Sequence, residues 1–232
     1  MNRAHMPKAP SPAPSESPAA RPARAREIID RLHALNPTAT TELHWSNPLE
    51  LLAAVILSAQ ATDVKVNEVT PGLFTEYRTA RDWAQADPAR LEQQVHALGF
   101  FRNKTKALIG MGRVLEAEFG GQVPRTMTEL LRLPGVARKT ANVVLGYAFG
   151  VAEGIVVDTH VTRVAYRLGL TQETKPERIE QDLMALLPRD YWIRTGTLLV
   201  LHGRYICVAG RPWCTRCPVY DLCPRVAVTN PR

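Results

Sequence analysis

Four cysteines stand close together near the C-terminus in the spacing C-x6-C-x2-C-x5-C, and the chain has no others: Cys207, Cys214, Cys217 and Cys223. Cysteine thiolates bind zinc or iron–sulfur clusters. Two disulfides or four inert buried thiols are alternatives, but a long chain without other cysteines or a signal peptide is not typical of a disulfide-stabilised protein. The spacing predicts one metal site and leaves zinc and a [4Fe–4S] cluster open.

The segment Leu133–Thr140 is a second group of residues that could bind a ligand or take part in a reaction. Pro134 and Gly135 predict a tight turn, and Thr126 with Glu129 predicts a capping box that opens a short helix before it. Such a turn leaves backbone N–H groups unpaired at the start of the next helix, which suits a phosphate. An ordinary corner between two helices is the alternative. The second helix is indicated by residues at helical spacing: Val136, Thr140, Val143, Val144 and Tyr147.

Two ionisable side chains follow at places where they could react. Lys139 comes directly after the turn, where it is either a phosphate contact or an amine nucleophile. Asp158 follows the apolar run 155–157 and precedes a helix, so it reads as an N-cap. The roles of N-cap and catalytic carboxylate are compatible in one aspartate.

The elements that position these groups are helices. Asn47, Pro48 and Glu50 read as the N-cap, first turn and capping carboxylate of an apolar helix. Pro71 is expected to bend or break one helix, and Gly99 to end another. No stretch shows a convincing period of two, so an all-α fold is expected. The expected helices cover residues from about 23 to 35, then 49–59, 63–77, 81–87, 88–98 and 103–119.

Length and charge bound the possibilities further. The 232 residues, 45% of them hydrophobic, make one large domain or two small ones. No apolar run reaches the roughly 18 residues that span a membrane, and the N-terminus lacks a secretory signal. Residues 1–22 contain six prolines and are expected to be a disordered tail. More than half of the net charge of +7 lies in residues 1–26, so nucleic acid would have to meet a local basic face.

Several motifs in order resemble one family. They are the segments 57–63, 133–145, 157–160 and 201–204, followed by the four-cysteine spacing. Together they are similar to the helix-hairpin-helix DNA glycosylase superfamily and, within it, to the endonuclease III family, over roughly Ala25 to Cys223. The resemblance implies a [4Fe–4S] cluster rather than zinc.

The resemblance also implies a domain organisation with two all-α lobes. A six-helix lobe would comprise residues 42–152, with the helix-hairpin-helix at about 126–149. A cluster lobe would comprise residues 23–41 and 153–232. DNA would bind in the cleft between the lobes.

Individual roles follow from the same resemblance. Lys139 matches the Schiff-base lysine of bifunctional glycosylases and Asp158 the catalytic aspartate. Gln60 and Phe100 match the polar plug and apolar wedge that fill the gap left by a flipped nucleotide, whereas on the residues alone they read as a helix-end Gln and a core Phe. The other expected DNA contacts are Gly135, Val136, Ala137, Arg138, Thr140 and His160. Basic residues around the cysteines are expected to face phosphates: His202, Arg204, Arg211, Arg216 and Arg225.

Two positions depart from the family pattern. Ala137 stands where a second hairpin glycine is usual, and if that position requires a positive φ, alanine costs about 1 kcal/mol. Phe100 stands where leucine is usual, and its aromatic ring is expected to stack more strongly on bases.

The sequence thus predicts a bifunctional DNA glycosylase and AP lyase of base excision repair that removes oxidised pyrimidines by base flipping, Schiff-base formation and β-elimination. A monofunctional glycosylase for mismatched adenine or thymine is the alternative on the same fold. A non-catalytic iron–sulfur DNA-binding protein is the alternative from another class. The expected partner is double-stranded DNA with damaged pyrimidines or abasic sites, bound by a monomer without membrane contact. The expected location is the bacterial cytoplasm at the nucleoid, or the nucleus or an organelle of a eukaryote.

Overall fold

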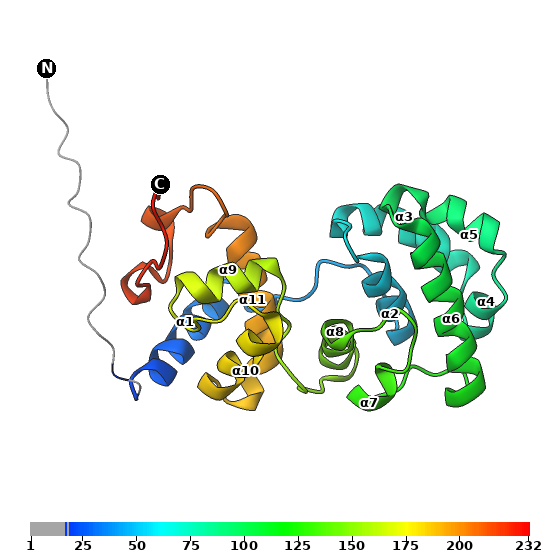
Figure 1. The fold of residues 1–232 in the computed structure, drawn as a ribbon, viewed down its shortest axis with the longest axis horizontal. Helices are drawn as coiled ribbons and strands as arrows, with labels where there is room; N and C mark the ends of the chain where they lie inside the picture. Colours follow the sequence, from blue (N-terminus) through cyan, green and yellow to red (C-terminus); the bar gives the residue numbers. More distant parts are fainter. Residues whose placement is uncertain (1–16, 18) are drawn as a thin grey trace, which may run out of the picture. The chain divides into compact units, whose positions relative to one another are not determined.

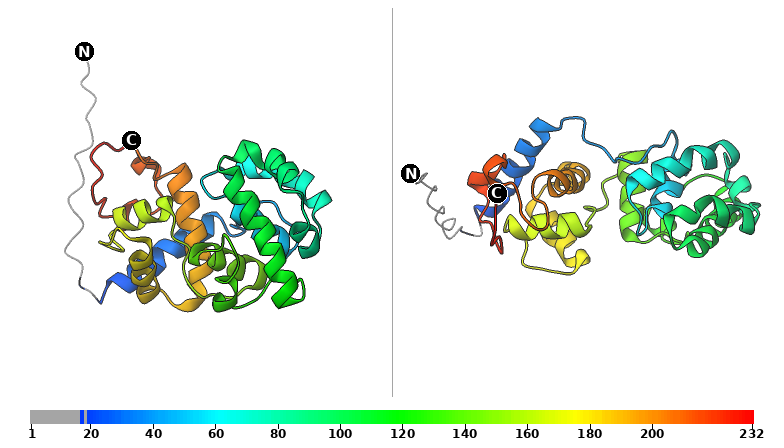
Figure 2. Two further views of the ribbon diagram at one scale, coloured as in Figure 1. Left: turned by 45° about the vertical axis from the view of Figure 1, so that its right-hand side comes forward. Right: turned by 90° about the horizontal axis from the view of Figure 1, so that it is seen from above.

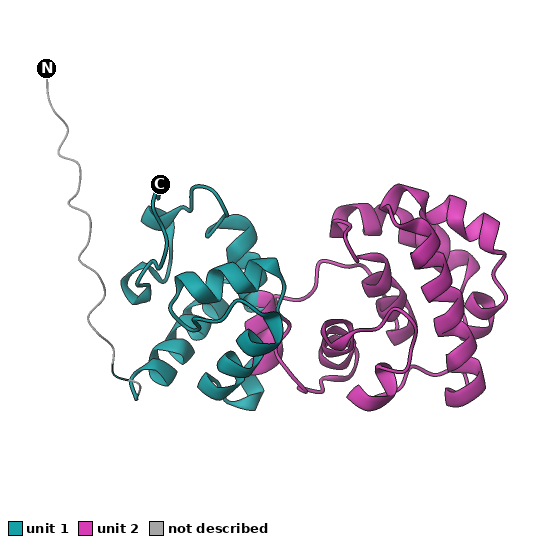
Figure 3. Ribbon diagram, viewed as in Figure 1, with its two compact units in different colours: residues 1–37, 157–191, 198–232 teal, residues 38–156, 192–197 magenta. Residues whose placement is uncertain are grey.

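The structure is a computed structural model that describes residue 17 and residues 19–232 (Figure 1). Every regular element in this part of the chain is a helix, which confirms the predicted all-α fold. The described residues form two compact units (Figure 3). Most of the expected disordered tail, residues 1–16 and 18, lies outside the described residues. No helix in the described part is long and apolar enough to cross a bilayer.

Unit 2 contains residues 38–156 and 192–197. Its large apolar core is built mainly from α2, α6 and α8, with the smaller helices packed around them. Its helices are α2 (Pro48–Leu57), α3 (Asp63–Glu76), α4 (Ala80–Ala84), α5 (Pro88–Val95), a 3-10 turn (His96–Leu98), α6 (Phe101–Phe119), α7 (Met127–Leu130), α8 (Arg138–Phe149) and the first residues of α11 (Trp192–Tyr205).

Local signals fix the start of several of these helices. Asn47 caps α2 by accepting the Glu50 N–H at 3.0 Å, and Pro48 occupies the first turn, as predicted. α2 ends at Leu57, two residues before the predicted limit. Pro71 lies inside α3 without breaking it, so the expected break does not occur, and Val66 and Leu73 are buried on either side of it.

Unit 1 brings together described residues from separate parts of the sequence: residue 17 and residues 19–37, 157–191 and 198–232. It contains α1 (Arg21–Leu35), α9 (Thr159–Arg167), α10 (Pro176–Leu186), the rest of α11 and short 3-10 turns, and α1 packs against α10 (Figures 1 and 2). The helix α1 begins at Arg21, with Pro22 in its first turn, where a missing N–H costs nothing. The predicted non-helical tail therefore ends two residues early.

The observed units differ slightly from the predicted domain ranges. The chain passes between units at residues 37–38 and 156–157, a few residues away from the predicted limits of 41 and 152. The predicted cluster lobe includes residues 192–197, but they belong to unit 2. The reason is local packing, because Ile193 lies against Gly146 and the Thr197 hydroxyl is hydrogen-bonded to the Tyr147 hydroxyl.

Candidate functional site

The hairpin between α7 and α8 depends on one glycine. Gly135 has φ +80°, and a Cβ atom at this position would lie 2.8 Å from the Cβ of Ala107. Only glycine fits both the backbone angle and the close approach. The Val136 N–H donates to the carbonyl oxygen of Leu133 at 3.1 Å and closes the turn. Val136 itself is buried, so it anchors the hairpin in the core of unit 2.

The helix α8 begins immediately after this turn with an exposed N-terminus. Ala137 is the N-cap residue and no side chain caps the helix there. Its φ of −96° is ordinary for alanine, so the backbone cost considered for this departure from the family pattern does not arise. Thr140 is half-buried, whereas Arg138 and Lys139 are exposed in the first turn. The first turn of a helix carries partial positive charge and can bind an anion.

Two other predicted DNA contacts sit in strained loops of unit 2. Gln60 follows α2 with φ +54°, and Phe100 precedes α6 with φ +48°. Positive φ costs energy for residues other than glycine, and such strain is concentrated at functional sites. The side chain of Phe100 is 58% exposed, so the alternative of a core phenylalanine is wrong. Gly99, also at positive φ, ends the preceding turn as predicted.

Asp158 is the N-cap of α9 in unit 1, as the sequence predicted. Its Oδ1 accepts the Val161 N–H at 2.8 Å, which fixes the carboxylate at the start of the helix. His160 lies two residues further on and is half-buried, with its Nδ1 3.3 Å from the guanidinium of Arg163. Lys139 and Asp158 therefore belong to different units, each fixed locally by a helix N-terminus.

The four cysteines of unit 1 line a single cavity. They form no disulfide. The Cys207 Sγ lies 3.5 Å from the guanidinium of Arg167, and the backbone N–H of Arg225 donates to the Cys223 Sγ at 3.4 Å. N–H donors directed at sulfur stabilise thiolate ligands and negatively charged clusters.

The protonation of these groups is set by burial. Burial raises the pKa of the Cys217 thiol to about 11, and it also raises the pKa values of Cys214 and Cys223. Thiolates at this site therefore need the positive charge of a metal group. His202 lies 3.7 Å from Cys217, and burial lowers its pKa to about 4, so its imidazole is neutral at pH 7.

The four thiols are a donor set for a metal group. Among residues 17 and 19–232, no three His, Cys, Asp or Glu side chains are arranged as ligands of one metal ion. A zinc ion with Zn–S bonds of about 2.3 Å would draw its four sulfur atoms close together. A [4Fe–4S] cluster is larger than one ion and holds its ligands further apart. Four thiols around one cavity are a donor set that suits either group.

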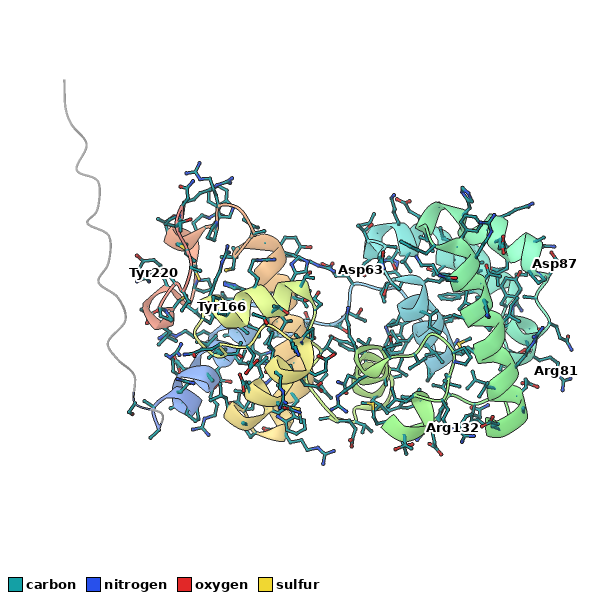
Figure 4. All side chains as sticks on the ribbon, viewed as in Figure 1. Asp63, Arg81, Asp87, Arg132, Tyr166 and Tyr220 are labelled. Carbon is teal, nitrogen blue, oxygen red and sulfur yellow. The ribbon has the colours of Figure 1, made fainter. Side chains whose placement is uncertain are left out.

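Some basic residues near the cysteines do not face solvent as predicted. His202 is only 5% exposed, because α11 turns it toward Cys217. The Arg225 guanidinium donates to the Tyr220 carbonyl and stacks over the ring of Tyr220, which Figure 4 labels, so Arg225 is half-buried in contacts within unit 1.

Three arginines whose structural role the sequence analysis missed hold the cysteine segment, residues 207–223. Arg167 donates to the carbonyl oxygens of Val208 and Ala209, each at 2.7 Å. Arg163 donates to the carbonyl oxygens of Gly203 and Cys207. Arg24 of α1 donates to the carbonyl oxygens of Leu168 and Leu222. The only signal in the sequence was the spacing of Arg163 and Arg167 by four residues on one helix.

Comparison with known proteins gives consistent matches. A family model described as HhH-GPD superfamily base excision DNA repair protein matches residues 53–189. Endonuclease III of Synechocystis sp. is 51% identical over 201 residues, which cover 87% of this chain and 92% of that protein. A solved non-covalent complex of endonuclease III with DNA is similar, with 42% identity and a TM-score of 0.82, over 87% of this chain and 94% of the other. A trapped covalent endonuclease III–DNA intermediate matches with the same identity and TM-score, over 87% and 95%.

Proposed function

Because the chain belongs to the endonuclease III family of the HhH-GPD superfamily, we propose that Lys139 is the nucleophile with which it excises damaged bases from DNA. The chain is a DNA glycosylase and AP lyase of base excision repair. The observation that carries the residue assignment is the exposed Lys139 in the first turn of α8, directly after the turn at Gly135.

The reaction proceeds in two stages. The amine of Lys139 forms a bond to C1′ of the damaged nucleotide as the glycosidic bond breaks, and the base leaves with one amine proton. The remaining nitrogen proton passes to O4′ as the C1′–O4′ bond opens, which gives an imine. The imine acidifies the C2′ proton, and its removal breaks the C3′–O bond on the 3′ side of the lesion.

Asp158 is the proposed partner of this lysine. Glycosidic cleavage develops positive charge on the sugar, and a carboxylate near C1′ stabilises that charge. Its Oδ1 is already bound to the Val161 N–H, so the N-cap interaction orients the carboxylate before DNA arrives. His160 of the same helix start is a proposed contact to the lesion or a nearby phosphate.

The nucleotide must leave the duplex before C1′ can be attacked. We assign the wedge to Phe100 and the polar plug to Gln60, because both stand in exposed, strained loops of the same unit as Lys139. The hairpin at Gly135, Val136 and Ala137 binds the phosphates beside the lesion through the N–H groups at the start of α8, while the Val136 N–H stays bonded within the turn. Arg138 and Thr140 lie in this turn and extend the contact.

The metal group is proposed to be a [4Fe–4S] cluster held by Cys207, Cys214, Cys217 and Cys223, which all line one cavity. When bound, the cluster cross-links the cysteine segment through its four iron–sulfur bonds. The substrate is proposed to be duplex DNA that carries oxidised pyrimidines or abasic sites. The chain is proposed to act as a monomer on the DNA of the bacterial nucleoid.

A borohydride trap tests the assignment. Reduction of the imine should link the protein covalently to duplex DNA that contains thymine glycol or an abasic site. Lys139→Gln should abolish the adduct and retain DNA binding. Lys65→Gln is the matched control, because Lys65 is also an exposed lysine in the first turn of a helix of unit 2 and should trap normally.

The same experiment separates the alternatives. A monofunctional glycosylase would release the base without an adduct, and a DNA-binding protein without activity would do neither. Base release without trapping by the iron-containing protein would contradict the role of Lys139.

A further inference from the structure

A groove in unit 2 carries three exposed cations on one helix. Arg102, Lys106 and Arg113 of α6 line it, and all three side chains are exposed. With a rise of about 1.5 Å per residue, they follow the helix over about 16 Å. The phosphates of one strand recur about every 3.4 Å along the axis of a duplex, so an edge of this length can follow several of them.

The groove is continuous with the hairpin. Pro134 and Gly135 of the hairpin line its other side. The α6 helix and the hairpin are in direct contact, because a Cβ on Gly110 would lie 3.0 Å from the Pro134 side chain, and one on Gly135 would lie 2.8 Å from Ala107. The cations and the hairpin therefore hold a fixed spacing within one unit.

These cations differ from other arginines of the same unit. Arg81, Arg90 and Arg132 each form an ion pair with a glutamate: Glu116, Glu76 and Glu118 respectively. Figure 4 labels Arg81 and Arg132. Within residues 17 and 19–232, Lys106 and Arg113 form no ion pair. Arg102 is 3.9 Å from Glu92, at the limit for an ion pair, and Glu92 is the only acidic residue that lines the groove.

We propose that this groove is a second contact for the sugar–phosphate backbone of the duplex that the hairpin holds, an inference that rests on the proposed function. The hairpin supplies backbone N–H groups at one end, and Arg102, Lys106 and Arg113 supply charge along the helix. Phosphate contacts position a protein on DNA and carry no sequence preference. The groove thus sets affinity and orientation for any lesion.

The test compares two triple variants with the same change in charge. Arg102→Gln/Lys106→Gln/Arg113→Gln removes the groove cations, and Arg81→Gln/Arg90→Gln/Arg132→Gln removes three paired ones. Affinity for an abasic-site duplex is measured across salt concentrations with circular dichroism as the check on folding. The slope of log K against log salt is negative, and removal of one phosphate-binding cation reduces its magnitude by about 0.9. The magnitude should therefore decrease by up to about 2.7 for the groove triple and by almost nothing for the paired triple.

Each outcome has one meaning. An unchanged slope for the groove triple, or an equal decrease in its magnitude in both triples, overturns the proposal that the groove contacts DNA. The proposed role of Lys139 still stands in that case if the unaltered protein traps DNA. A missing adduct from the unaltered protein defeats the proposed function instead. If the groove triple folds poorly, Lys106→Gln alone, at an exposed site, should reduce the magnitude of the salt slope by about 0.9. An unchanged slope for this single variant also overturns the proposal.

A different observation concerns Lys104, which is 4% exposed. Its Nζ donates to the carbonyl oxygen of Leu98 at 2.8 Å, and its backbone N–H donates to the carbonyl oxygen of Phe100 at 3.1 Å. These two bonds join α6 to both ends of the strained turn at Gly99 and Phe100. Burial lowers the pKa of Lys104, so burying this ammonium has a cost.

The geometry points to Lys104 as a positioning residue that holds the turn of Phe100 in its strained, exposed conformation. Removal of the Leu98 bond would let the turn relax and move the phenyl ring away from the duplex. This second inference also rests on the proposed function.

A double-mutant cycle distinguishes positioning from general stability. Single-turnover base release is measured at a temperature where all variants are folded. Phe100→Ala and Lys104→Met should each slow base release by about tenfold or more, and the double variant should be no slower than Phe100→Ala alone. Additive effects, or normal base release by Lys104→Met, would overturn the assignment. A failure of base release by the unaltered protein would count against the proposed function itself.

Discussion

The hairpin of unit 2 and the cysteine segment of unit 1 are held by bonds of different range. The hairpin is closed by the Val136 N–H and the nearby Leu133 carbonyl and is packed through Gly135. The cysteine segment has only short 3-10 turns, and its carbonyl groups are bound by Arg167 and Arg24, which are about 40 and nearly 200 residues distant in the chain. The hairpin should therefore form without the metal group, whereas the cysteine segment should need it.

Loss of one cysteine should have the largest effect on stability. If it has no such effect, the cysteine segment does not need the metal group and the contrast with the hairpin is wrong. Cys217→Ser should prevent the proposed [4Fe–4S] cluster from assembling, with loss of its visible absorption. Loss of a structural metal group typically costs more than about 4 kcal/mol, which corresponds to about 10 °C in Tm for a chain of this size. Hydrogen exchange should show weaker protection in the cysteine segment and unchanged protection in α8. Thr215→Ala, an exposed site in the same segment, is the control.

Loss of one arginine should have the next largest effect. Arg167→Gln removes charge-assisted hydrogen bonds to Val208 and Ala209 and should cost about 2–3 kcal/mol, measured by denaturant unfolding of the iron-containing protein. Arg167→Lys keeps the charge but not the fork of donors, so it should recover only part of this stability. Full stability of Arg167→Gln would mean that the segment is held by the cluster alone.

A smaller effect is expected in the hairpin. Gly135→Ala forces alanine to φ +80° and brings its Cβ within 2.8 Å of Ala107. The positive φ alone costs about 1–2 kcal/mol, and affinity for abasic-site DNA should fall because the turn must shift. Iron content should stay normal, since the hairpin and the cysteine segment belong to separate units. Reduced iron content would contradict that independence.

Ala137→Gly should have the smallest effect. Ala137 has φ −96°, so glycine relieves no strain. Glycine is a better N-cap than alanine but loses more backbone entropy, and the two effects should cancel to within about 0.5 kcal/mol. DNA affinity should also be unchanged. A clear gain in affinity would show that the hairpin adopts a positive φ at this position when it binds DNA.

The sequence separation between interacting residues also explains which features could be predicted from the sequence. Asn47 and Asp158 are recognisable as N-caps because each acts on a residue three positions away. The all-α fold, the hairpin and the start of α8 follow from similarly local signals. The continuity of α3 through Pro71 does not, because core contacts outweigh local propensity there.

Long-range partners leave no comparable signal. Nothing near Arg167 in the sequence marks the carbonyl groups at 208 and 209 as its partners, and nothing near His202 marks its burial beside Cys217. The exposure of Phe100 follows only from the family resemblance, because a phenylalanine beside apolar neighbours otherwise reads as core. The groove on α6 has no signature in the sequence, because its other wall is contributed by the hairpin.

The chain order of unit 1 has a consequence for biosynthesis. The Arg24 side chain is made early, but its acceptors Leu168 and Leu222 leave the ribosome much later. Most of unit 2, residues 38–156, emerges as one uninterrupted stretch between them. We therefore expect unit 2 to fold during translation. The helix α1 can pack in unit 1 only after the C-terminal part of the chain has been synthesised.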